Sequence, residues 1–257
     1  MLKKFLYSSV LFVSLTSLVN ATTVVFNTSQ GEIEVNLFDE TTPKTVANFL
    51  QYIDENHYTN SVIHRVAPDF IVQGGGFEFT GAWPLNSLEA NPSVVNEPVY
   101  SNVKGTIAMA KNSTSINSAT NQWFFNLKDN SQNLDLQNGG FTVFGQVISG
   151  MDVIEKIGRL ELCFKSNDGS GIPVVKDESQ TCDDLSTASI ENVVVINQID
   201  ILDSSTVTDA DLNPVKNTLI IPEPIPDHGD DSSGGSFSWL TIFCLLLLSM
   251  RKITIRS

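Results

Sequence analysis

Residues 62–77 read V-I-H-R-V-A-P-D-F-I-V-Q-G-G-G-F, and the rest of the chain is interpreted from this stretch outward. It places one permanent cation, Arg65, among apolar residues, with the aromatic Phe70 and the neutral amide Gln73 close behind. If the stretch folds as strand, turn and strand, these three side chains converge on one concave surface. The stretch carries neither a nucleophile nor a set of metal ligands. A fixed cation with apolar walls and an amide suits the binding of a neutral polypeptide backbone.

The composition of the chain fits one domain with extra segments at its ends. The chain has 257 residues, 41% of them hydrophobic and 15 of them Phe, which is ample for a single core. The formal net charge of −14 argues against nucleic acid or an anionic membrane surface as a partner. The Gly run at 74–76 is followed by Phe77 and Glu78 instead of Lys and Ser or Thr, so it is not a phosphate-binding loop. We expect no cofactor and no metal.

The hydrophobic pattern predicts a mainly β domain of eight strands and two helices. Residues 23–29 and 32–38 alternate apolar and polar side chains around a Ser-Gln-Gly turn, as in an antiparallel hairpin. One helix is predicted from Pro43, with Thr42 as its N-cap, to about residue 57. A second is predicted from a capping box at 149–152 to about residue 158. The other strands are predicted as two within residues 62–77 and the segments 105–110, 122–127, 141–148 and 192–202.

Two helices are too few to cross between parallel strands, so the strands are expected to pair antiparallel. The architecture that best fits is a closed, eight-stranded antiparallel barrel capped by the two α-helices. The segments that are polar or lack periodicity are expected to be loops: 77–104, 111–121, 128–140 and 160–189.

The first 21 residues are typical of a secretory signal peptide. Lys3 and Lys4 precede an apolar run over residues 5–19, and Val-Asn-Ala then offers a small-residue cleavage site after Ala21. The apolar run is short for a membrane-spanning helix. We therefore expect export to the periplasm, the cell surface or the medium, with a folded domain over residues 22–203.

The C-terminal part of the chain has a different amino-acid composition. Residues 204–233 are rich in Ser, Thr, Asp and Pro and are predicted to be a disordered linker. Residues 234–257 begin with a Gly pair, continue with an apolar run and end with basic residues, and so resemble the GlyGly-CTERM sorting tail of Gram-negative bacteria. The resemblance implies cleavage by a rhomboid-type protease after a transient stay in the inner membrane. A plain tail anchor is the alternative.

Two of the three cysteines lie in the predicted domain. Cys244 falls in the terminal apolar run, which leaves Cys163 and Cys182 as the natural disulfide pair of an exported chain. Closing that loop would contribute about 3 kcal/mol in the chain-entropy model. Two unpaired buried thiols are the alternative, and the spacing without a nearby His is poor evidence for zinc.

Five motifs in order resemble the cyclophilins, the family of peptidyl-prolyl cis/trans isomerases. The opening stretch is similar to the family signature F-H-R-x-x-x-x-F-x-x-Q-G-G. The other similar motifs are G-T-I-A-M-A-K (105–111), S-A-T-N-Q-W-F-F-N (118–126), N-L-D (133–135) and V-F-G-Q-V (143–147). The resemblance covers residues 23–202 and is strongest to the periplasmic bacterial branch. It implies an isomerase acting as a monomer on proline-containing polypeptides, without nucleic acid or cofactor.

The chemistry of this activity needs little from the protein. Rotation about an X–Pro bond is slow because amide resonance sets a barrier of roughly 18–20 kcal/mol, and a donor aimed at the nitrogen of the twisted amide lowers it. Arg65 is the expected donor, and Phe70 and Gln73 complete the expected catalytic set. The expected substrate-binding residues are Ile71, Met109, Ala110, Lys111, Gln122, Phe124, Leu134 and Phe141.

Three positions differ from the usual cyclophilin pattern. Asn133 stands where the family often has Trp, Phe141 where many members have His, and Lys111 where Asn is frequent. The first two changes predict lowered or altered activity. The rival hypothesis is a non-catalytic module that holds proline-containing segments, and a third is a mainly structural surface protein.

Overall fold

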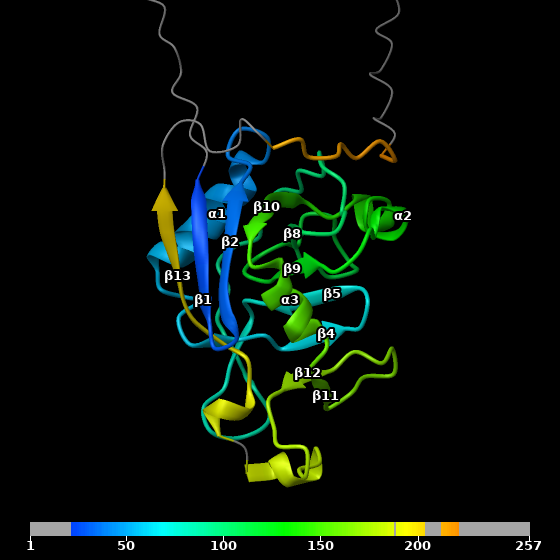
Figure 1. Cartoon of the computed structure of the whole chain (residues 1–257). Helices are drawn as coiled ribbons and strands as arrows, with labels where there is room; N and C mark the ends of the chain where they lie inside the picture. The colour runs from blue at the N-terminus through cyan, green and yellow to red at the C-terminus, as the bar shows by residue number, and fades with distance from the viewer. Residues whose placement is uncertain (1–21, 188, 204–211, 221–257) are drawn as a thin grey trace, which may run out of the picture. The chain divides into compact units, whose positions relative to one another are not determined.

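Eleven antiparallel strands form one curled sheet in the computed structural model, which describes residues 22–187, 189–203 and 212–220 (Figure 1). These residues all belong to the first of two units, residues 1–220. The neighbours in the sheet run β4-β5-β9-β8-β10-β2-β1-β13-β3-β6-β7, and β11 and β12 pair separately. The strands are β1 (Thr23–Thr28), β2 (Gly31–Leu37), β3 (Ser61–Val62), β4 (Arg65–Ala67), β5 (Ile71–Gly74), β6 (Phe77–Glu78), β7 (Asn86–Ser87), β8 (Thr106–Met109), β9 (Trp123–Asn126), β10 (Val143–Ser149), β11 (Glu161–Cys163), β12 (Ile172–Val174) and β13 (Val195–Asp203).

Three α-helices and three 3₁₀ helices complete the described elements: α1 (Pro43–Asp54), α2 (Ser131–Leu134), α3 (Met151–Gly158), η1 (Gln137–Gly139), η2 (Asp183–Thr187) and η3 (Ile190–Asn192). The prediction of a mainly β domain is confirmed, and α1 and α3 lie where helices were predicted. The closed, eight-stranded barrel is not confirmed, because the strand pairs form an open series that ends at β4 and β7. The added strands β3, β6 and β7 have two residues each, too few to show an alternating pattern.

The two faces of the sheet at β4, β5, β9 and β8 bury different sets of side chains. Successive residues of a strand point to opposite faces, so Ile107, Met109, Trp123 and Phe125 face the main core. Their neighbours on the other face form a second cluster: Ile71, Ala108, Ala110, Phe124, Leu134 and Val143, with Phe38, Phe70 and Phe141. The second cluster, as shown below, is the floor of a groove.

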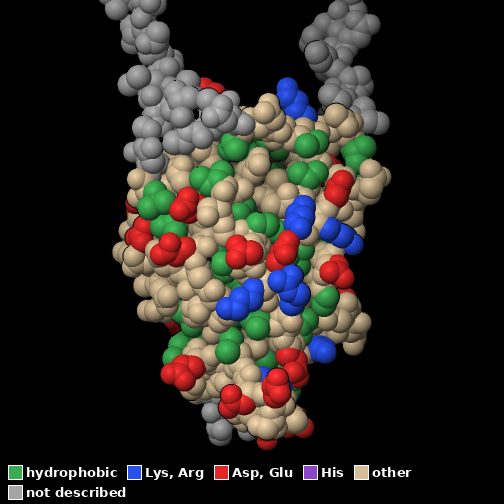
Figure 2. All heavy atoms as spheres, in the orientation of Figure 1, with side chains coloured by type: hydrophobic (Ala, Val, Ile, Leu, Met, Phe, Trp, Pro, Cys, Tyr) green, Lys and Arg blue, Asp and Glu red, His purple; other side chains and the backbone are tan. Residues whose placement is uncertain are grey.

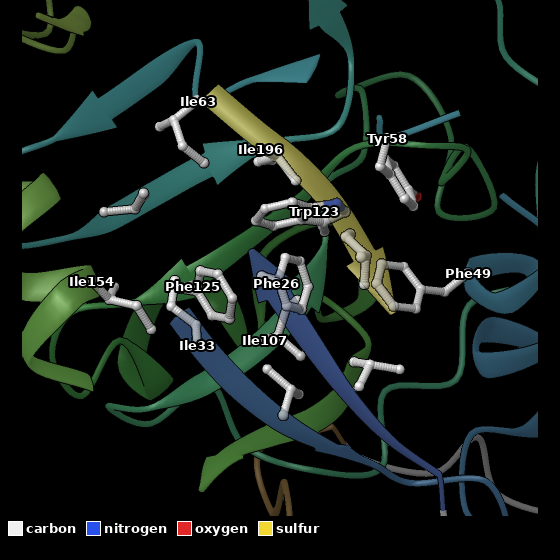
Figure 3. Close-up of a cluster of buried hydrophobic side chains, with 14 of the residues drawn as sticks. Phe26, Ile33, Phe49, Tyr58, Ile63, Ile107, Trp123, Phe125, Ile154 and Ile196 are labelled. Carbon is white, nitrogen blue, oxygen red and sulfur yellow. The ribbon is translucent and has the colours of Figure 1, made fainter. Parts of the chain in front are cut away.

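Aromatic rings fill the centre of the main core (Figure 3). Phe26 packs edge-on against Trp123 with ring centroids 5.0 Å apart and against Phe125 at 5.5 Å. Phe49 from α1 and Tyr58 close the same cluster, with centroids 5.4 Å apart. All five rings are almost completely buried. Such edge-on contacts add to the free energy of burial and fix the sheet on which the groove lies.

Helix α1 begins as predicted at Pro43, but its N-terminus is capped by a distant residue. The Thr42 hydroxyl donates to the Phe38 carbonyl instead of capping the helix. The carboxylate of Glu97 accepts hydrogen bonds from the backbone N–H groups of Lys44 at 3.3 Å and Thr45 at 2.9 Å. A carboxylate at this end of a helix satisfies free donors and complements the helix dipole. The long loop that contains Glu97 is therefore anchored to the domain.

Helix α3 begins without the predicted capping box. Its N-cap is Gly150, whose φ of 82° is in the left-handed region. A Cβ at this position would lie 2.3 Å from the carbonyl oxygen of Glu32, so only glycine fits between β2 and the helix. The predicted capping box is therefore wrong, and the residue that matters at this helix start is Gly150, which is required for steric reasons.

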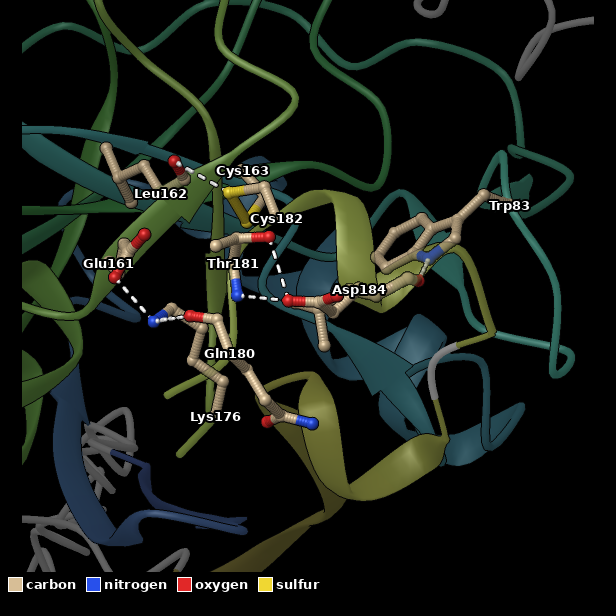
Figure 4. Close-up of a disulfide and its surroundings, with 10 residues drawn as sticks. Trp83, Glu161, Leu162, Cys163, Lys176, Gln180, Thr181, Cys182 and Asp184 are labelled. Atoms are coloured by element: carbon tan, nitrogen blue, oxygen red, sulfur yellow. Dashed lines mark hydrogen bonds and ion pairs between the residues drawn. A yellow bond between two sulfur atoms is a disulfide. The ribbon is translucent and has the colours of Figure 1, made fainter. Parts of the chain in front are cut away.

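The segment from Leu160 to Val193 forms a small subregion closed by a disulfide bond. Cys163 and Cys182, the predicted pair, are bonded to each other (Figure 4). Around them lies a separate apolar cluster: Val62, Phe79, Cys163, Val174, Leu185, Val193 and Val195. Figure 2 shows acidic side chains gathered over this end of the domain, where Asp177, Asp183, Asp184 and Glu191 are exposed.

Both ends of the described domain are tied to its body. The backbone N–H and the hydroxyl of the buried Thr22 donate to the carboxylate of Asp39, each at 2.8 Å. Residues 212–220 were predicted to lie in a disordered linker, yet they pack on the domain. Ser101 donates its backbone N–H to the Val215 carbonyl at 2.8 Å, and the Asn217 side chain donates to the Asp135 carbonyl at 3.1 Å.

The predicted signal peptide and sorting tail, and the rest of the predicted linker, lie outside the described residues. Within the described ranges, no helix has the length and apolar character needed to cross a membrane. The same ranges contain no group of three or more His, Cys, Asp or Glu side chains placed to hold a metal ion.

Candidate active site

Strand register brings the central predicted residues side by side. Arg65 on β4 is paired with Gln73 on β5, and Gln73 is paired with Phe124 on β9. Ile71 precedes Gln73 by two residues, so both point to the groove face of the sheet. Phe70 lies in the tight turn between β4 and β5, in which Asp69 adopts a left-handed φ of 53°.

Three side chains fix the guanidinium of Arg65. Its Nε–H donates to the Ser170 hydroxyl at 3.1 Å, one terminal nitrogen donates to the Gln73 side-chain oxygen at 3.3 Å, and the other donates to Asp168 at 2.9 Å. A guanidinium has five N–H donors, so these contacts leave two that no described residue occupies. Arg65 therefore has a fixed orientation and free donors at the same time.

Asp168 is an acceptor within this arrangement. The hydroxyl and backbone N–H of Ser170 donate to it, and Arg65 lies beside it, so the pKa of its carboxyl is lowered to about 2. The carboxyl is exposed, which limits the strength of the ion pair. Its main effect is to orient the guanidinium.

Arg65 forms part of the wall of a pocket of about 230 Å³. The wall is mainly apolar on one side and polar where Arg65 lies. Its members are Arg65, Phe70, Ile71, Gln73, Ala110, Lys111, Phe124, Leu134, Gln137 and Phe141. A cavity of this size and lining suits a compact apolar ring attached to a polar backbone.

A second pocket of about 300 Å³ adjoins the first and shares Gln73, Ala110 and Lys111 with it. Its other lining residues are polar: Asn112, Ser118, Thr120 and Gln122. The Gln73 amide donates to the Gln122 side-chain oxygen at 2.9 Å, which connects the two pockets. The pair forms one groove that is apolar at one end and polar at the other.

The glycine run after Gln73 leaves room for residues 121 and 122 to pack directly against the backbone. A Cβ on Gly76 would lie 2.6 Å from atoms of the Gln122 side chain. Gly75 has a φ of 90°, and a Cβ there would lie 2.4 Å from the Asn121 carbonyl oxygen. Only glycines let Gln122 lie over the strand and reach Gln73.

A buried polar network stands behind the apolar walls. Asn130 donates to the Phe70 carbonyl at 2.9 Å, and Asn102 donates to the Phe141 carbonyl at 3.1 Å. The buried Asp135 carboxylate, next to Leu134, accepts bonds from the Ser101 hydroxyl and from the backbone and side chain of Asn102. Three separate walls of the pocket are thus held by neighbouring hydrogen bonds.

Lys111 closes the edge between the two pockets. Its ammonium donates to the carbonyls of Asn138 at 2.8 Å and Gly140 at 2.7 Å and lies 5.0 Å from the centre of the Phe141 ring. Burial lowers the pKa of Lys111 to about 8. Through its contacts with the Gly140 carbonyl and the Phe141 ring, the Lys111 side chain supports the Phe141 wall.

The structure brings ten of the eleven predicted site residues to the groove. Nine line the first pocket: Arg65, Phe70, Ile71, Gln73, Ala110, Lys111, Phe124, Leu134 and Phe141. Gln122 lines the adjoining one. Met109 is different: its side chain has no exposed surface and lies in the main core. Alternation along β8 turns Met109 away from the groove and leaves Ala110 at its surface.

Sequence reasoning missed the residues that hold the site together. Asp168 and Ser170 come from a polar segment about 100 residues after Arg65, and no motif marked them. Gln137, a further wall residue, lies in η1, within a predicted loop. The only available signal for Asp135 was its place in the N-L-D motif, which carried no physical role.

The comparisons with known proteins agree with this geometry. The family model described as cyclophilin-type peptidyl-prolyl cis-trans isomerase/CLD matches residues 23–177. The chain belongs to the cyclophilin family. Within the family, this cyclophilin is 41% identical over 138 residues to peptidyl-prolyl cis-trans isomerase B of Escherichia coli, covering 52% of this chain and 82% of that protein.

Two other relatives extend the comparison. Peptidyl-prolyl cis-trans isomerase A of Dickeya dadantii is 38% identical over 173 residues, covering 63% of this cyclophilin and 87% of the relative. A crystal structure of a cyclophilin-type isomerase from Cryptosporidium parvum is similar in fold, with a TM-score of 0.50, 19% identity, and coverage of 72% of this chain and 99% of that one. The relatives and the family model establish this cyclophilin as a peptidyl-prolyl cis-trans isomerase.

Proposed function

We propose that Arg65 performs the isomerisation by donating a hydrogen bond to the nitrogen of a twisted X–Pro amide. The two guanidinium N–H groups that no described residue uses carry this proposal. A planar amide nitrogen is a poor acceptor, because its lone pair is delocalised into the carbonyl, and twisting restores the lone pair. A donor at this position therefore binds the transition state more tightly than the ground state.

The apolar pocket is the proposed site of the proline ring. Phe70, Phe124 and Leu134 belong to the cluster beneath it, and its volume of about 230 Å³ leaves room for a five-membered ring. The pocket holds the ring still while the preceding carbonyl rotates. The two ends of the amide thereby turn relative to each other. No proton is transferred, so the reaction needs no acid or base.

Gln73 and Gln122 are the proposed contacts for the backbone before the proline. Each side-chain amide nitrogen has two N–H groups, and Gln73 uses one of them on Gln122. The remaining N–H groups can donate to carbonyls of an extended peptide. Asn133 is exposed and does not line the pocket, so we propose that Gln137 and Phe141 bound the open side instead.

The proposed clients are exported proteins. The N-terminal segment supports secretion with cleavage after Ala21, and the Gly pair at 234 and 235 with its apolar run supports recognition by a rhomboid-type protease. The domain would then act as a monomer in the periplasm or at the cell surface. Cell fractionation followed by N-terminal sequencing tests this directly: a product that begins at Met1 in the cytosol would overturn it.

The first experiment measures X–Pro exchange in a short blocked peptide by NMR, with the full chain and its Arg65→Ala variant. We expect loss of at least tenfold in kcat/KM, because removal of one preorganised donor commonly costs about 10²–10³ in rate. Arg159→Ala is the matched control, because Arg159 is a well-exposed arginine that lines neither pocket of the groove. It should retain the parent's rate.

Three further outcomes would change the interpretation. If Arg65→Lys retains full activity, a point charge is sufficient and the forked geometry of the guanidinium is not the cause. If the folded parent binds proline peptides but does not accelerate exchange, the non-catalytic binding module is correct for this chain. A parent that does neither would leave only the structural role.

A further inference from the structure

A pocket of about 540 Å³ lies beside the groove, in the region closed by the disulfide. We call it the Trp83 pocket. Its lining residues are His64, Phe77, Trp83, Pro84, Leu85, Phe164 and Ile172. They come from three separate parts of the chain, and none carries a permanent charge. A ligand of this pocket must therefore be neutral and largely apolar, which excludes metal ions and phosphates.

The walls of the Trp83 pocket are held in place. The Trp83 ring packs against Phe164 with centroids 4.5 Å apart and against Phe79 at 5.1 Å. Its indole N–H donates to the Leu185 carbonyl at 2.8 Å, just after the disulfide-bonded Cys182 (Figure 4). The pocket is thus a built feature of this subregion, although Phe164 is 51% exposed.

His64 forms part of the wall of the pocket, and the Val62 carbonyl lies near its ring. On the apolar side the ring packs against Phe77 with centroids 4.6 Å apart.

The Trp83 pocket and the groove share one wall. His64, at the pocket, immediately precedes Arg65, at the groove. Ile172, at the pocket, follows by two residues Ser170, whose hydroxyl holds Arg65. The Gln122 side chain, which lines the polar end of the groove, also interacts with the His64 ring. The linings of the two sites therefore meet where the His64 ring contacts the Gln122 side chain.

We propose that the Trp83 pocket binds a large apolar side chain, aromatic or branched aliphatic, of the same polypeptide whose X–Pro bond lies in the groove. This rests on the isomerase activity and adds a substrate preference to it. The apolar lining selects the side chain, and the shared wall of His64 and Gln122 sets its distance from the proline. The pocket would favour segments of incompletely folded proteins, in which apolar residues and X–Pro bonds are exposed together.

The test uses the full chain and a series of blocked decapeptides with one Ala-Pro bond. One peptide has Ala at the other positions, with two lysines at one end for solubility, and in the rest a single Phe is placed at successive distances from the proline. We expect one range of positions at which Phe lowers KM about five- to tenfold while kcat changes little. The value corresponds to partial burial of one aromatic side chain.

Variants assign the effect to the pocket. Phe164→Ser, at a half-exposed residue, should remove the advantage of the Phe peptides and leave exchange of the short peptide unchanged. Leu85→Ser is the second variant should the first not fold. Ile148→Ser is the matched control, because Ile148 is 46% exposed and lies outside the pocket. It should retain the full advantage.

A direct readout separates this proposal from the catalytic one. The NMR signal of the Trp83 indole N–H should shift on addition of a proline-free Phe peptide, even in Arg65→Ala, where turnover is lost. The proposal is overturned if Phe gives no advantage at any position, or if the advantage persists in Phe164→Ser. It is also overturned if a free apolar molecule such as benzyl alcohol shifts the indole signal while no Phe peptide does.

Discussion

The groove and the disulfide-closed subregion are held in place by different interactions. The groove walls come from four adjacent strands and from a buried polar network that includes Asn102, Asn130 and Asp135. The described part of the subregion at residues 160–193 has two three-residue strands, two short 3₁₀ helices, a small apolar cluster and one covalent crosslink. The difference teaches that a site needing tight geometry is built on sheet register, whereas a surface added beside it is held by a crosslink.

The largest expected effect is on the groove. Asp135→Ala leaves the Ser101 hydroxyl and two donors of Asn102 without their acceptor. We expect the free energy of unfolding to fall by roughly 3–5 kcal/mol, with a loss of kcat/KM because Leu134 and Phe141 lose their support. Urea denaturation and peptide exchange measure both. Asp54→Ala, at an exposed position on α1, is the control and should stay near the parent value.

The next effect concerns the crosslink. Replacing Cys163 and Cys182 together by Ser should lower the free energy of unfolding by about 3 kcal/mol for a loop of this length. Exchange of a short peptide at a temperature where the variant stays folded should change less than twofold, because the groove does not depend on the crosslink. A large loss of short-peptide activity in the folded variant would contradict the comparison.

A pH effect is expected at His64, where the two regions meet. Burial lowers its pKa from 6.5 to about 4, so the unfolded chain takes up a proton there before the folded chain does. Stability should therefore fall as the pH drops from 6.5 to 4, by about 3 kcal/mol from this residue. Urea midpoints across this range check it. His64→Gln should have a flatter profile, and the contribution of His57, whose pKa burial also lowers, remains in both proteins.

The smallest effect is expected where residues 212–220 pack on the groove side of the domain. Asn217→Ala removes the hydrogen bond to the Asp135 carbonyl and should lower the free energy of unfolding by about 1 kcal/mol. A modest, two- to threefold loss of kcat/KM should accompany it, because Asp135 adjoins Leu134. Unchanged values for both would show that this segment only covers the surface.

Local pattern predicted the convergence of Arg65, Phe70 and Gln73, which are close in sequence on a strand, a turn and the next strand. The distant groove residues, such as Gln122 and Phe124, were placed by the resemblance of their motifs to the cyclophilins, because local pattern does not encode the pairing of Gln73 with Phe124. The alternation of side chains along β8 was overlooked for Met109, which faces the core while Ala110 faces the groove. The short strands β6 and β7, and the contact of Asp168 and Ser170 with Arg65, depend on long-range packing that no local pattern encodes.

The first described residue has a consequence for processing. The Thr22 backbone nitrogen donates to the Asp39 carboxylate. In the uncleaved chain this nitrogen belongs to a neutral amide, but cleavage after Ala21 would turn it into an ammonium group, largely protonated at neutral pH. A hydrogen bond would become a charge pair, which is stronger at the same distance. Removal of the leader would then fasten the N-terminal end of β1, so that the mature domain would be more stable than its precursor.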